Sequence, residues 1–188
     1  MGLVAKDNGG GGFNRQLPTP GLHHAVCSKA FDLGLQAESY NGESSTRHKA
    51  LVVWEIDELI DDESSEYNGK RLLVHREYTL SLTEKSRLRE HLESWRGKEF
   101  SDKELADGFD ITKLLGVQCQ LMVMTKTSKA GNQYAVVQSV APAGKTPPLM
   151  NPELPDDWCP EWIKKKIAEG VGAVGDVADQ TFDDDVPF

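Results

Sequence analysis

The segment Lys70-Arg-Leu-Leu-Val-His-Arg-Glu-Tyr-Thr-Leu-Ser-Leu82, continuing into Thr83-Glu-Lys-Ser86, contains the change of periodicity that decides the fold. Residues 70–82 alternate with a period of two, which is typical of a strand. Thr83 then matches a helix N-cap, and Gly97 matches a helix end. Between them, apolar residues recur at spacings of four and three: Leu88, Leu92 and Trp95. A strand followed by a helix is therefore predicted.

Four further strands are predicted around this pair, over residues 21–35, 49–56, 117–125 and 133–140. Residues 38–47 and 57–69 are interpreted as loops, and residues 126–132 as the turn of a hairpin. A second short helix is predicted over residues 101–106. The order of three strands, helix and two strands is the connectivity of the OB-fold. The expected fold class is therefore mainly β: a five-stranded OB-fold Greek-key barrel with a helical insert between strands three and four.

The 188 residues suit one domain with a long appendage. We expect a flexible N-terminal arm over 1–20, the OB-fold domain over 21–141, and a proline-rich connector with a short helix over 142–169. Residues 170–188 are glycine-rich and acidic, and are expected to form a disordered tail. No apolar run of 18 residues occurs and the N-terminus is polar, which favours an unexported, cytoplasmic protein that does not enter a membrane.

The charge is unevenly distributed. The chain has 21 basic and 30 acidic residues. Residues 151–188 contain 3 of the basic residues and 10 of the acidic ones. A protein that binds duplex phosphate over its whole surface is thereby disfavoured. Three cysteines without a C-x-x-C pair predict reduced thiols rather than a disulfide framework or a zinc site. No cofactor or metal is expected, and no grouping of nucleophile, base and orienting residue predicts an enzyme.

The chain ends in three carboxylates followed by a hydrophobic tip. Burial of a terminal phenylalanine ring in a partner's pocket is worth about 1.5 to 3 kcal/mol. Neighbouring aspartates raise the rate of encounter with a basic rim. These features predict a partner-binding peptide made of Asp183, Asp184, Asp185, Val186, Pro187 and Phe188.

This ending resembles the C-terminal tail of bacterial single-stranded DNA-binding proteins, whose acidic residues and final Pro-Phe recruit replication and repair enzymes. The insert over 83–115 and the proline-rich connector depart from the bacterial pattern. With Tyr78-Thr-Leu-Ser-Leu82 and Leu92-Glu-Ser-Trp-Arg-Gly97, the chain looks more like a bacteriophage single-stranded DNA-binding protein. The resemblance implies sequence-independent binding of single-stranded DNA in phage replication, recombination and repair, in the host cytoplasm. It also implies that the tail recruits a polymerase, helicase, primase, nuclease or recombinase, while self-association stays open.

OB-folds bind single strands along strands two and three, between the loops that join strands one to two and four to five. Aromatic side chains stack on bases, and basic side chains follow the phosphates. The candidate DNA-binding residues are Lys29, Arg47, Lys49, Trp54, Arg71, His75, Arg76, Tyr78, Lys126, Lys129 and Tyr134. Trp54 and Tyr78 have core packing as the alternative. For Lys126 and Lys129, the alternative is that they only increase the solubility of the surface.

Two other functions compete with this hypothesis. The barrel could bind a protein, so that the chain is an adaptor that recruits or blocks a host replication enzyme through its tail. The acidic loop over 57–63 could belong to a metal-dependent nuclease, but such a charge run is usually solvated. A titration with oligo-dT separates the binder from the adaptor.

Overall fold

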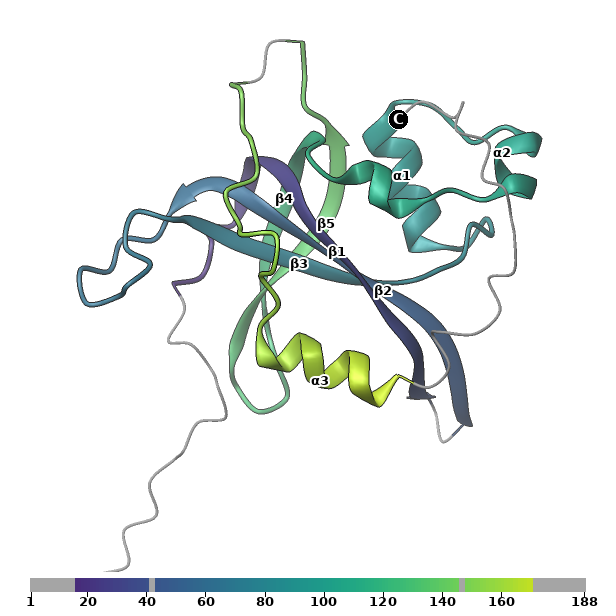
Figure 1. The fold of residues 1–188 in the computed structure, drawn as a ribbon, viewed down its shortest axis with the longest axis horizontal. Helices are drawn as coiled ribbons and strands as arrows, with labels where there is room; N and C mark the ends of the chain where they lie inside the picture. The colour runs from purple at the N-terminus through teal and green to yellow at the C-terminus, as the bar shows by residue number, and fades with distance from the viewer. Residues whose placement is uncertain (1–15, 41–42, 146–147, 171–188) are drawn as a thin grey trace, which may run out of the picture.

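The computed structural model describes residues 16–40, 43–145 and 148–170, so most of the predicted arm and the whole 183–188 peptide lie outside the described residues. Five strands form one antiparallel sheet in the order β3-β2-β1-β4-β5 (Figure 1). Their bounds are β1 Gly21–Tyr40, β2 Glu43–Leu59, β3 Arg71–Thr79, β4 Gln118–Thr127 and β5 Gln133–Pro142. The helices are α1 Arg87–Arg96, α2 Asp102–Asp107, α3 Glu161–Glu169 and the 3₁₀ turn η1 Ile111–Leu114.

The mainly β class and the predicted order of strands and helices are confirmed. The sheet is open, because β3 and β5 are its two edges and share no ladder in the described part of the chain. The edges nevertheless approach each other, since the Arg76 guanidinium of β3 donates a hydrogen bond to the Val137 carbonyl of β5. A closed barrel is not observed.

The first two strands are longer than predicted. The predicted loop over 38–47 was wrong, because polar residues there continue the antiparallel ladder, with Gln36 opposite Arg47. A polar sequence does not prevent pairing when the partner strand follows directly in a hairpin. Irregularities between Cys27 and Lys29 and between Asp32 and Gly34 let β1 bend. Gly34, with φ of 68°, suits the second bend.

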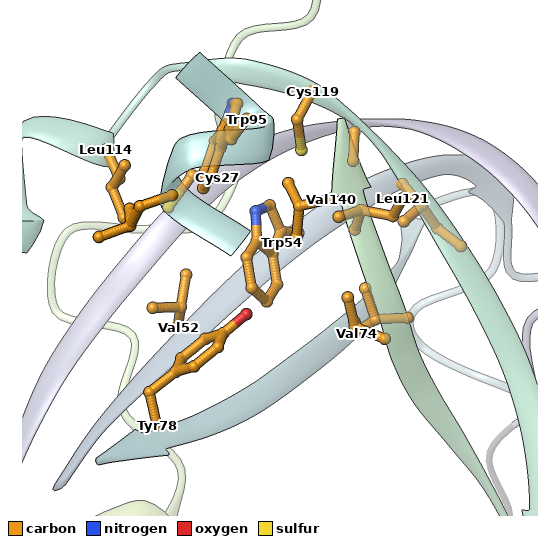
Figure 2. Close-up of a cluster of buried hydrophobic side chains, with 14 of the residues drawn as sticks. Cys27, Val52, Trp54, Val74, Tyr78, Trp95, Leu114, Cys119, Leu121 and Val140 are labelled. Atoms are coloured by element: carbon orange, nitrogen blue, oxygen red, sulfur yellow. The ribbon is translucent and has the colours of Figure 1, made fainter. Parts of the chain in front are cut away.

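The main core lies between the sheet and α1 (Figure 2). The Trp54 and Trp95 rings lie 6.0 Å apart at its centre, and the Trp95 Nε1 donates to the Gln118 carbonyl at 3.0 Å. The helical face predicted from Leu88, Leu92 and Trp95 is confirmed. The predicted N-cap at Thr83 was wrong, because Ser86 accepts the hydrogen bond from the Arg89 amide instead. Gly97 ends the helix in the left-handed conformation, as predicted.

A second apolar cluster lies on the opposite face of β1 and β2. Leu33, Leu51 and Val53 are covered there by Ile163 of α3, which is fully buried. The half-buried rings of Trp158 and Trp162 extend the same cluster. The helix predicted after Pro160 is confirmed, and residues 148–170 form an integral layer of the fold.

None of the helices in the described ranges combines the length and the apolar character needed to cross a membrane. The three cysteines are free. Burial raises the pKa of the Cys27 and Cys119 thiols, so that both side chains behave as apolar core groups.

Candidate nucleic-acid interface

Two of the predicted DNA-binding residues are core residues, in agreement with the core-packing alternative given for both. Trp54 is 1% exposed and packs on Trp95. Tyr78 is also buried, and its hydroxyl lies 2.7 Å from the His91 Nδ1. Figure 2 shows both rings inside the same apolar cluster. Burial raises the pKa of Tyr78 and also lowers the pKa of His91 to about 4. The Tyr78–His91 contact is therefore a pair of neutral groups near pH 7.

Three further predicted residues contact the C-terminal layer. The Lys29 Nζ donates to the Asp156 carbonyl at 3.2 Å. The Arg71 guanidinium lies 3.0 Å from the Glu153 carboxylate and donates to the Asn151 carbonyl at 2.8 Å. The His75 ring packs on the Trp162 ring, with centroids 5.0 Å apart. The predicted DNA path along strands two and three is therefore covered by residues 151–162 of the same chain.

A buried carboxylate that sequence reasoning missed fixes this cover to the sheet. Glu55 is 1% exposed and accepts hydrogen bonds from the Ser28 hydroxyl at 2.7 Å and from the Glu153 and Leu154 amides at 2.7 and 3.0 Å. Its second oxygen lies 3.4 Å from the Arg71 guanidinium. A buried charge requires such partners. Its position between Trp54 and Ile56 in an apolar strand was the available signal.

The basic residues of the β1–β2 hairpin and of β3 are also engaged. Arg47 lies 3.4 Å from the Glu38 carboxylate, and Lys49 forms an ion pair with the same group. The hydrogen bond from Lys49 lowers the pKa of Glu38. Lys49 also lies 4.0 Å from Glu77, and Arg76 is bonded to β5. These three cations are largely neutralised or held by the protein itself.

The last three predicted residues come together at the end of the β4–β5 hairpin. Lys126 lies opposite Tyr134 across the two strands, and Lys129 lies in the turn between them. Both lysines are exposed, and Tyr134 is 46% exposed. Within the described ranges, no hydrogen bond or ion pair holds the two ammonium groups. The turn itself is ordered by bonds from the Ser128 amide to the Asn132 carbonyl at 2.8 Å and from the Gly131 amide to the Ser128 carbonyl at 3.0 Å.

The hairpin lies in the longest stretch of this acidic chain that lacks carboxylates. Residues 111–152 contain four lysines, Lys113, Lys126, Lys129 and Lys145, and no Asp or Glu. The 30 acidic residues all lie outside this stretch. A local count of charge would have found this segment, whereas the net charge of the chain conceals it. An exposed aromatic ring beside unpaired lysines is the arrangement that holds stacked bases and phosphates.

Among the described residues, no three His, Cys, Asp or Glu side chains converge into a metal site. No protein-family model matches the chain, and a search of curated proteins finds no match either.

Proposed function

We propose that the chain is a non-catalytic, sequence-independent single-stranded DNA-binding protein. The observation that carries the proposal is the exposed Tyr134 beside Lys126 and Lys129, which have no partner among the described residues, on a hairpin without carboxylates. The strand order supports an OB-type architecture, since OB-folds are partly open five-stranded barrels that bind through the loop between strands four and five. The proposal places binding at this hairpin rather than along strands two and three.

The 183–188 peptide is the proposed recruiting element. Its three aspartates and terminal Phe188 suit a basic-rimmed hydrophobic pocket on another protein. The sequence resemblance favours phage replication, recombination and repair as the setting, with a polymerase, helicase, primase, nuclease or recombinase as the partner. DNA binding and recruitment are then carried by separate parts of one chain.

Titration of fluorescein-labelled oligo-dT at low salt tests the proposal on the full-length protein. We expect saturable binding that Tyr134→Ala weakens about tenfold, because a base stacked on an aromatic ring is worth about 1 to 3 kcal/mol. Removal of residues 183–188 should leave the DNA affinity unchanged or raise it while abolishing partner binding. Absence of oligo-dT binding by the wild-type protein at low salt refutes the proposal.

One observation favours a protein–protein adaptor as the second candidate. Of the eleven predicted DNA-binding residues, only Lys126, Lys129 and Tyr134 are free of the core and of partners within the described ranges. An adaptor would bind a replication enzyme through its tail and would show no affinity for oligo-dT. The same titration therefore decides between the two functions.

A further inference from the structure

The outer face of β4 carries an apolar strip where solvent normally selects polar residues. Leu22 of β1 and Met122 of β4 are opposite each other in the ladder and are 59% and 36% exposed. Met124, two residues nearer the hairpin turn, is 45% exposed. The alternate residues Leu121 and Val123 point into the core. A strand with one solvated face is expected to alternate apolar and polar residues, so this strip has no explanation in folding.

The strip is continuous with the proposed DNA-binding hairpin. Lys126 follows Met124 on the same face of β4, and Tyr134 lies across from Lys126 on β5. From Lys126 back to Met122 the strand advances four residues, or about 13 Å. At about 3.4 Å per stacked nucleotide, this length matches about four bases, the lower end of the site sizes of OB-folds.

The surroundings of the strip indicate the chemistry of its occupant. Its two methionines lie on the β4–β5 hairpin, which carries lysines and no carboxylates and therefore favours a polyanion. Its side chains are two methionines and a leucine, which favour flat apolar groups and adapt to their shape. An unpaired nucleic acid strand offers both properties on one molecule. A duplex offers its phosphates but keeps the faces of its bases stacked inside.

We propose that the strip formed by Leu22, Met122 and Met124 contacts the unpaired bases of a strand whose phosphates are held by Lys126 and Lys129. The strip thereby makes the site select single strands over duplex. This inference rests on the proposed function and names the residues that give it specificity.

The test compares Met122→Gln/Met124→Gln with the wild-type protein in titrations against oligo-dT and against a blunt duplex of equal length. Glutamine matches methionine in length and is tolerated on a solvated strand, so the fold is retained, which thermal melting verifies. We expect about a tenfold loss of oligo-dT affinity, with no change in duplex affinity or in the salt dependence. Met122→Leu/Met124→Leu should retain most of the affinity for oligo-dT, because leucine keeps the apolar contact.

Ile167→Gln is the matched control, since Ile167 is 38% exposed on α3, outside the strip. It should leave the oligo-dT affinity unchanged. If the wild-type protein binds oligo-dT and the double glutamine variant binds within twofold of it, the inference is overturned while the proposed function stands. If the wild-type protein does not bind, both fall.

A second copy of the chain is the alternative occupant of an exposed apolar strip. Sedimentation velocity of both proteins without DNA examines this alternative. A wild-type dimer that the glutamine substitutions convert to a monomer would overturn the inference in favour of self-association. An unchanged sedimentation coefficient supports the assignment to bases.

Discussion

Replacing both hairpin lysines by alanine should change how DNA affinity responds to salt. Each phosphate neutralised on a single strand contributes about 0.7 to the slope of log K against log salt. Lys126 and Lys129 are exposed, and neither is bound to a carboxylate in the described ranges. If each neutralises one phosphate, Lys126→Ala/Lys129→Ala lowers the slope by about 1.4.

This change in slope corresponds to a measurable ratio of affinities. Between about 50 and 200 mM salt, the wild-type protein should lose about seven times more affinity than the double variant. Fluorescence anisotropy with labelled oligo-dT at four or five salt concentrations measures both slopes. The advantage of the wild-type protein is largest at low salt and shrinks as salt screens the phosphates.

Lys164→Ala/Lys165→Ala is the matched control, because it removes the same charge from α3. Lys164 lies 2.7 Å from the Glu161 carboxylate and Lys165 lies 3.8 Å from that of Glu169. These ammonium groups are already partly compensated, so we expect the slope to change by less than about 0.3. Equal changes of slope in the two double variants would refute the reasoning, because DNA would then respond only to the net charge of the protein.

Three further predictions concern the C-terminal layer and the core. Ile163→Ala should lower the free energy of unfolding in urea by about 2 to 5 kcal/mol, because Ile163 is fully buried. Ile167 is exposed, so Ile167→Ala should change this free energy by less than about 0.5 kcal/mol. Equal effects of the two substitutions would mean that α3 is not part of the cooperative fold. Glu55→Ala should lower the free energy of unfolding by about 2 to 5 kcal/mol in the same assay, since it leaves the Ser28 hydroxyl and the Glu153 and Leu154 amides without their acceptor. A loss below about 1 kcal/mol would contradict the role of Glu55 as an anchor. Burial lowers the pKa of His91 to about 4 in the folded state, whereas the unfolded side chain titrates near 6.5. The unfolded state therefore binds the proton first as pH decreases, and the free energy of unfolding should fall between pH 6.5 and 4. In urea titrations of His91→Gln, this part of the pH dependence should be absent.

The order of the elements could be predicted because each element has a clear period. Residues 70–82 alternate with a period of two, and Leu88, Leu92 and Trp95 repeat as a helix does. The lengths of β1 and β2 could not be predicted in the same way. Their hairpin ends carry polar residues on both faces, so only the pairing of the backbones defines them.

The accessible side chains of β2 could not be predicted, because its residues 50–56 are buried on both faces of the sheet. Val52, Trp54 and Ile56 point into the main core, while Leu51 and Val53 lie under α3. Alternation with a period of two assigns these residues to two faces of the strand, but it does not show whether either face is exposed to solvent. The cover depends on contacts between residues more than 100 positions apart, such as the hydrogen bond from the Gln36 side-chain amide to the Lys166 carbonyl. Local sequence contains no signal of that packing, so it could not show that residues 151–162 cover the expected DNA path along strands two and three.

The distribution of charge determines how such a protein can bind DNA. The cations of β1, β2 and β3 are held by Glu38, Glu55, Glu77 and Glu153 or by backbone carbonyls, so they have little attraction left for phosphate. The carboxylate-free stretch supplies at most four lysines, and four neutralised phosphates correspond to a slope of about 2.8. If the proposed function holds, affinity must come mainly from contacts with bases, through Tyr134 and the apolar strip. Such a protein should stay bound to a single strand at salt concentrations that dissociate a protein dependent on phosphate contacts. Its affinity for a duplex should be low, because it cannot reach the paired bases.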